Sequence, residues 1–95
     1  MPQTYAQALA RYQNARVQFD AYCQAIPVSL VFKNGATIML DNRSGDGRIV
    51  AVAGVQYNLA GYGWRIITLS SKTLPADQPI DCGSARNVSI IHLYK

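Results

Sequence analysis

Two cysteines, Cys23 and Cys82, are the side chains of this chain best suited to covalent chemistry. A nucleophilic cysteine needs a nearby cation or helix N-terminus to favour its thiolate, and Arg86, close to Cys82, is the supporting feature. The spacing fits neither a CxxC redox motif nor a zinc site. Two interpretations remain, a disulfide in an oxidising compartment or two unrelated buried thiols in the cytosol. We favour the disulfide, which would close a loop of about 60 residues and stabilise the fold by roughly 4 kcal/mol.

The other titratable side chains form no catalytic or metal-binding pattern. His92, the single histidine, lacks the serine and aspartate arrangement of a general base and is interpreted as a half-buried strand residue. The five acids are all aspartates: Asp20, Asp41, Asp46, Asp77 and Asp81. The segment DNRSGDG lacks the acidic spacing of a calcium loop, so we expect a turn there. We therefore expect a protein that is not an enzyme and has no catalytic residues, metal or cofactor.

Aromatic and basic side chains define a candidate binding surface. Tyr57, Tyr62 and Trp64 stand among glycines and could form an exposed patch for carbohydrate or a protein partner, or equally pack between sheets. The net charge is +4, but the nine basic residues are scattered singly. Nucleic-acid binding is not expected, because it usually requires a clustered basic patch. The fold could still bring Arg43, Arg48 and Arg86 to one end.

The first 26 residues predict an amphipathic helix over residues 4–26. Thr4 and Gln7 have the spacing of a capping box, and no proline interrupts the segment from there until Pro27. Residues on one helical face recur at spacings of three and four: Tyr5, Leu9, Tyr12, Arg16, Phe19, Cys23 and Ile26. We expect this face to lie against a sheet, although it could also mediate self-association.

The remainder, residues 28–95, predicts about seven short β-strands. Asn34-Gly35 favours a two-residue type I′ hairpin between strands in the range 28–42. A loop follows at 43–47, and glycines at 54, 61 and 63 separate strands at 48–53, 55–59 and 64–70. A polar connection at 71–79 leads to strands at 80–82 and 87–94. The short connections indicate an antiparallel Greek-key sandwich, mainly β or α+β, in a single domain of 95 residues. No run is long enough to span a membrane.

The order of these features resembles the small β-sandwiches of the cupredoxin family. The residues that carry the resemblance are VFKNGATIMLDN, RIVAVAG, the aromatic and glycine turn before WRIITL, and IDCGSARNVSII. They span roughly the last seventy residues. The resemblance implies a sandwich over 28–95 to which the N-terminal helix has been added.

The resemblance also implies where a blue-copper site would lie and what is missing from it. Cys82 stands at the position of the cysteine ligand, Arg48 near the first histidine and Arg86 near the second, and no methionine follows Cys82. Arginine offers only donors and cannot replace an imidazole ligand. The resemblance therefore implies a metal-free relative in which Cys82 is released for a bond to Cys23. Arg48 and Arg86 could then form a salt-bridged loop end with Asp46 or Asp81.

From these observations we expect a non-enzymatic, exported domain that acts by binding or by assembly into a larger structure. The chain has no recognisable signal segment, so we expect a leader to have been removed. A copper-handling or electron-transfer protein and a small cytosolic binding module with free thiols are the alternatives. A protein partner or self-association would use the helix face or the aromatic turn.

Overall fold

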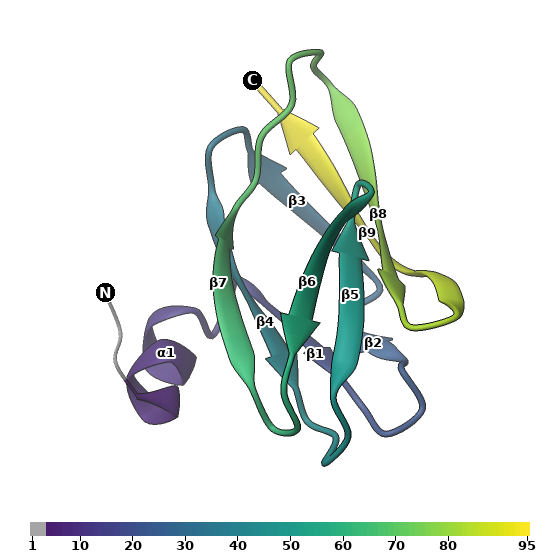
Figure 1. Ribbon diagram of the computed structural model, residues 1–95. Helices are drawn as coiled ribbons and strands as arrows, with labels where there is room; N and C mark the ends of the chain where they lie inside the picture. The colour runs from purple at the N-terminus through teal and green to yellow at the C-terminus, as the bar shows by residue number, and fades with distance from the viewer. Residues whose placement is uncertain (1–3) are drawn as a thin grey trace.

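Two β-sheets pack face to face, with one short helix beside them, in residues 4–95, the part of the chain that the computed structural model describes (Figure 1). The helix is α1 (Tyr5–Arg11), and the strands in these residues are β1 (Arg16–Phe19), β2 (Ala25–Ile26), β3 (Ser29–Lys33), β4 (Thr37–Asn42), β5 (Arg48–Val52), β6 (Val55–Leu59), β7 (Trp64–Thr68), β8 (Ala76–Cys82) and β9 (Ala85–Tyr94). The four-stranded sheet has the order β2-β1-β4-β7, and the five-stranded sheet has the order β3-β9-β8-β5-β6. The predicted mainly-β sandwich with an N-terminal helix is confirmed.

The core lies between the two sheets and follows the alternation of each strand. Ser89, Ile91 and Leu93 of β9 are buried, whereas its other face is more exposed. The largest fully buried side chains come from both sheets and include Phe19, Ile38, Leu40, Ile80, Ile91 and Leu93. The isoleucine and phenylalanine side chains among them are of the β-branched and aromatic types that suit a pleated, buried surface.

The helix predicted over residues 4–26 ends far earlier than expected. Thr4 caps it, accepting a hydrogen bond on its hydroxyl from the Gln7 backbone N–H at 3.2 Å, but α1 stops at Arg11. The chain then forms β1 and β2, so the proposed stripe beyond Tyr12 is not helical. Val17 and Phe19 are fully buried two residues apart. Pairing of β1 with β4 and burial of these two side chains outweigh the helical spacing in this segment.

The shortened helix still packs on a sheet. Ala8 and Tyr12 form a second buried cluster with Met39 on the outer face of the four-stranded sheet, and Trp64 and Ile66 pack against it. Figure 1 shows α1 beside β4 and β7, away from the five-stranded sheet.

The predicted hairpin at Asn34-Gly35 is wrong. β3 belongs to the five-stranded sheet and β4 to the other, so this turn carries the chain from one sheet to the other. Gly35 has a φ of 92°, and the Ala36 N–H donates to the Lys33 carbonyl at 3.0 Å. β4 pairs instead with β1 and β7. Its five consecutive buried residues, 38–42, are covered on both faces, because Ile38 and Leu40 join the core between the sheets and Met39 packs against the α1 cluster.

A two-residue hairpin with positive φ at both central residues occurs instead between β5 and β6. Ala53 and Gly54 have φ values of 50° and 86°, and Val52 pairs with Val55 across the turn. These values match the type I′ requirement. The strand break predicted at Gly54 is confirmed. The type I′ hairpin that we expected at Asn34-Gly35 occurs here instead.

Two further details of the predicted sandwich are corrected. The pairing is not antiparallel throughout, because β1 runs parallel to β4 and β3 runs parallel to β9. The region described has nine strands rather than about seven, and β8 begins at Ala76, inside the predicted connection. Gln78 and Ile80 alternate inward there, and Pro79 points to the other face. Polar composition concealed this strand.

Candidate functional site

One end of the sandwich gathers four connections that are distant in sequence. Figure 1 shows the β1–β2, β4–β5 and β6–β7 loops at the lower end, with the β8–β9 turn beside them. The Tyr62 N–H donates to the Ser44 carbonyl at 2.8 Å, which joins two of these loops. Arg43, Arg48, Tyr62 and Arg86 lie in or next to these connections, so this loop end contains most of the predicted site residues.

A disulfide joins Cys23 to Cys82, with 5.3 Å between their Cα atoms. Cys23 lies in the β1–β2 turn, next to the four-stranded sheet, and Cys82 ends β8 in the five-stranded sheet. The bond therefore connects the two layers across the loop end. The predicted disulfide is confirmed.

Arg48 forms a hydrogen bond to the β1–β2 turn, which contains Cys23. Its Nη2 donates to the Ala21 carbonyl at 2.7 Å and to the Ser44 hydroxyl at 3.4 Å. It lines a surface hollow of about 270 Å³ together with residues 21–23 and 82–85. Arg48 and the disulfide thus border the same hollow.

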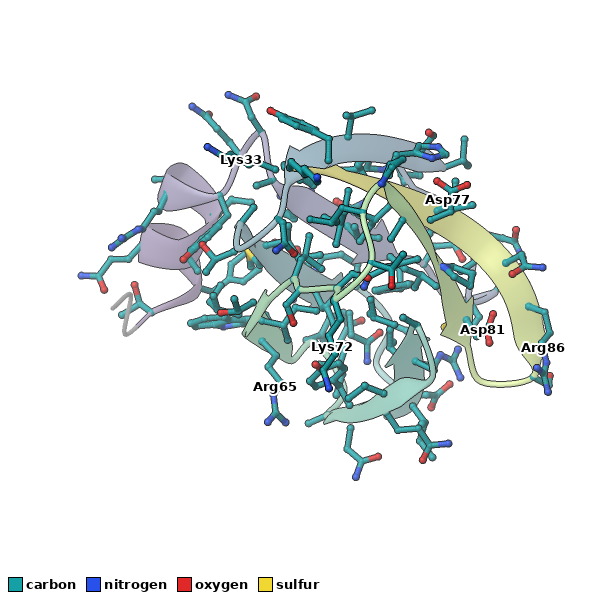
Figure 2. All side chains as sticks on the ribbon, turned by 90° about the horizontal axis from the view of Figure 1, so that it is seen from above. Lys33, Arg65, Lys72, Asp77, Asp81 and Arg86 are labelled. Carbon is teal, nitrogen blue, oxygen red and sulfur yellow. A yellow bond between two sulfur atoms is a disulfide. The ribbon has the colours of Figure 1, made fainter. Side chains whose placement is uncertain are left out.

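Arg86 lies in an adjacent but separate hollow. That hollow measures about 380 Å³ and is lined also by Ile49, Gln56 and Asp81. Figure 2 shows Arg86 and Asp81 beside the β8–β9 turn. Gly83 and Ser84 border both hollows. Within residues 4–95, neither Arg48 nor Arg86 forms an ion pair with Asp46 or Asp81, so the predicted salt-bridged loop end is wrong.

A buried carboxylate organises the other side of the loop end. Asp41 is fully buried and accepts hydrogen bonds from the Tyr5 hydroxyl and from Arg43 Nε, each at 2.8 Å. The Arg43 guanidinium lies 4.3 Å from the centre of the Tyr5 ring and 5.5 Å from that of Tyr62. Its Nη2 also donates to the Tyr62 carbonyl at 2.8 Å. This cluster fixes α1 and the β6–β7 loop to the end of β4.

Burial raises the pKa of the Tyr5 hydroxyl above its ordinary value, and its hydrogen bond to Asp41 raises it further. Both effects favour the neutral phenol. Sequence reasoning missed this cluster. The available signal was an aspartate inside the apolar run TIMLDN with an arginine two residues later, which places both side chains on one face of an extended chain.

The three aromatic residues of the candidate binding surface separate from one another. Tyr57 is half-buried beneath the Arg65 guanidinium at 5.2 Å, and Trp64 is half-buried against the helix cluster. Tyr62 alone of the three is largely exposed, at 62%, and has a φ of 55°. The loop end therefore presents Tyr62 and not a continuous aromatic patch.

His92 lies on the outer face of the five-stranded sheet. It is near the C-terminal end of β9, whereas the loop end lies at the start of this strand. It pairs with Val31 and Asp77 on neighbouring strands, and its Nδ1 is 2.6 Å from Asp77 Oδ1. Both side chains are substantially exposed. This places the single histidine on a sheet face and not beside Cys82.

Comparison of the sequence with known families and curated proteins identifies no function. No protein-family model matches the chain, and no curated protein matches it significantly. Solved structures do match. A purple cupredoxin from Nitrosopumilus maritimus aligns with a TM-score of 0.63 and 10% identity over 83% of this chain and 98% of that protein.

Two other copper proteins give similar alignments. A variant of amicyanin in the Cu(I) form has a TM-score of 0.59 and 14% identity, covering 82% of this chain and 81% of its own. The copper-containing nitrite reductase from Thermus scotoductus has a TM-score of 0.62 and 19% identity over 85% of this chain, which spans only 22% of the reductase. This chain has a cupredoxin-like fold.

The residues at the loop end of this cupredoxin-like domain do not fit a blue-copper centre. Such a centre needs a thiolate and two imidazoles. Here the Cys82 sulfur is bonded to Cys23, and the single histidine pairs with Asp77 on a sheet face. Within residues 4–95, no group of three or more histidine, cysteine or acidic side chains is placed to hold a metal ion.

Proposed function

We propose that this chain is a non-enzymatic, exported domain with a cupredoxin-like fold that acts by binding a partner or by assembling into a larger structure. The observation that carries the proposal is the Cys23–Cys82 disulfide at the loop end. This bond uses the Cys82 sulfur, which a copper centre would require as a free thiolate. Disulfides persist mainly in oxidising compartments, which supports export. Among residues 4–95, no helix has the length and apolar character to cross a membrane.

The binding surface in this proposal is the loop end, where Tyr62 is an exposed aromatic side chain. Arg43 stacks beside Tyr62 and bonds to its carbonyl, so the ring is presented from a fixed turn. Aromatic side chains supply a large contact area at little cost in conformational entropy. If the loop end mediates assembly, Tyr62→Ala should weaken self-association in sedimentation velocity and barely lower thermal stability. A large stability loss, or unchanged association in a protein that does self-associate, would argue against this surface.

A copper titration tests the metal-free part of the proposal. Cu(II) is added to the oxidised protein, and Cu(I) followed by air is added to the reduced protein, with absorption followed across the visible range. Amicyanin serves as the positive control. We expect no thiolate-to-copper absorption band in either state, because only one histidine is available and it lies on a sheet face. An intense band that is lost in Cys82→Ser would establish a copper-handling protein instead.

A count of free thiols tests export. The protein is isolated from its own source under denaturing conditions that trap thiols, and alkylated cysteines are counted by mass. We expect neither of the two cysteines to be alkylated before reduction, and both to be alkylated after it. Two free thiols would favour a cytosolic module, and the export proposal would be withdrawn.

A further inference from the structure

Arg48 has a hydrogen-bonding capacity that the protein does not use. Within residues 4–95, its Nε is the one buried side-chain nitrogen or oxygen atom without a hydrogen-bond partner. Only Nη2 of the same guanidinium is engaged, by Ala21 and Ser44. A guanidinium carries five N–H donors and no acceptor, and a buried unsatisfied donor calls for a missing acceptor such as an ion or water.

The hollow that Arg48 lines has other unused donors, on Ser84, and no acid. The hollow, of about 270 Å³, is lined by residues 21–23, Arg48 and 82–85, none of which is acidic. Neither the backbone N–H nor the hydroxyl of Ser84 has a hydrogen-bond partner within the described chain. The disulfide provides an apolar wall, and Tyr22, at 83% exposed, stands at the border. A cation and free donors around an apolar wall are the features of an anion site.

We propose that this hollow, the Arg48 hollow, binds a carboxylate group carried by a protein or peptide partner. Arg48 is the single cation that lines it, which matches one negative charge better than the nearly two charges of a phosphate monoester. The planar guanidinium also matches the planar carboxylate. The inference rests on the proposed binding function for the statement that a partner carries the ligand.

The walls of the Arg48 hollow are held in place before any ligand arrives. The Asp20 carboxylate accepts hydrogen bonds from the Tyr22 and Gln24 N–H groups at 2.8 and 3.0 Å. The turn is fixed further by the disulfide and by the bond from Arg48 to the Ala21 carbonyl. Binding therefore requires little additional ordering of the loop, which favours affinity.

The test uses NMR of the oxidised, ¹⁵N-labelled chain, following the Arg48 Nε–H and Ser84 N–H signals. Sodium acetate replaces sodium chloride at constant ionic strength, and sodium phosphate is titrated in parallel. We expect acetate to move both signals along one saturable curve and phosphate to bind more weakly. Absence of saturable shifts, or tighter binding of phosphate than of acetate, would overturn the proposal.

Two variants test whether acetate binds in the Arg48 hollow. Arg48→Gln should weaken acetate binding at Ser84 by roughly tenfold or more, the loss expected for one charge-assisted hydrogen bond. Lys72→Gln removes one positive charge from an exposed position in the β7–β8 connection, outside the loop end, and should leave the affinity within about twofold. Equal weakening by both variants would indicate general charge attraction and contradict the site.

The Arg48 Nε–H signal in the unsubstituted protein decides the question even if Arg48→Gln does not fold. The outcome is also separable from that of the proposed function. The copper titration and the thiol count do not depend on acetate, so a failed acetate titration with no copper band leaves the metal-free exported domain intact and removes only the carboxylate site.

Discussion

Asp41 is a fully buried carboxylate that joins side chains from separate parts of the chain. Tyr5 reaches it from α1 and Arg43 from the loop after β4, while Arg16 Nε of β1 lies 3.6 Å from its Oδ2. Removing one partner of a buried ion pair is costly because the remaining charge is uncompensated. At the residue scale, this cluster determines how the helix and the loop end are attached.

The raised pKa of Tyr5 predicts a loss of stability at alkaline pH. The ordinary value is 10.0, and the folded protein keeps the phenol neutral to higher pH. The unfolded chain therefore loses this proton first, so the contribution is complete below pH 10.0 and is lost as pH rises through the folded value. Urea unfolding between pH 8 and pH 11 should show a falling free energy of unfolding whose slope is reduced in Tyr5→Phe. Tyr22→Phe, at an exposed ring, is the control, and an equal slope in Tyr5→Phe and the unsubstituted protein would contradict the argument.

Gly61 is required by a close contact between backbones and not by its φ. A Cβ at this position would lie 2.1 Å from the Gly45 carbonyl oxygen, so the β4–β5 and β6–β7 loops would have to separate. Gly61→Ala should lower the free energy of unfolding by about 1–3 kcal/mol, as overpacking does. Gly47→Ala is the matched control, because its Cβ would meet only the Leu59 carbonyl at 3.5 Å. Equal stabilities of the two variants, measured by urea unfolding, would refute the close contact.

At the scale of elements, α1 acts as a cover for one face of the four-stranded sheet. Seven residues are too few for a helix to be stable alone. Its burial of Ala8 and Tyr12 on Met39 supplies the missing stability. The helix face, for which self-association was the alternative to packing on a sheet, is therefore partly occupied by the chain's own sheet.

Ala8→Asp should detach α1 from the sheet. Ala8 is fully buried, and an unpaired charge there cannot be accommodated. Trp64, the single tryptophan, packs against the same cluster and reports the change. We expect a red shift of tryptophan emission together with lower stability. Ala6→Asp, at an exposed position of the same helix, should leave the emission unchanged. An unshifted emission in folded Ala8→Asp would show that the helix does not shield Trp64.

At the scale of the whole molecule, the disulfide joins two layers that the chain order alone leaves far apart. It links two positions separated by 59 residues in the sequence. It also connects one sheet to the other. A constraint of this length restricts the unfolded chain strongly. The same bond fixes the turn that Arg48 contacts, so stability and the Arg48 hollow are coupled.

Reduction of the disulfide should lower the free energy of unfolding by about 4 kcal/mol on the chain-entropy model. The reduced, unsubstituted protein is the best comparison, because both sulfurs remain in place and no cavity is created. Urea unfolding of oxidised and reduced samples measures the difference. The same unfolding midpoint in both states would show that the bond does not constrain the unfolded ensemble.

The sequence by itself determined the local features whose cause lies within a few residues. Thr4 begins the helix, Ala53-Gly54 forms a turn, and the last strand has a period of two along β9. The order of motifs also resembled cupredoxins, and the cysteine pairing was among the interpretations it allowed. These features depend on backbone preference and on a period of two, which short segments carry.

The tertiary structure alone decided which segments pair and which side chains meet. Residues 16–19 carry a helical spacing, yet they become β1 because β4 offers a parallel partner and burial. Asn34-Gly35 favours a hairpin, yet β3 and β4 join different sheets. The Asp41 cluster and the Arg48 hollow bring together residues from separate connections. Local propensities are worth about a kilocalorie per mole or less, and burial and long-range pairing of whole strands exceed them.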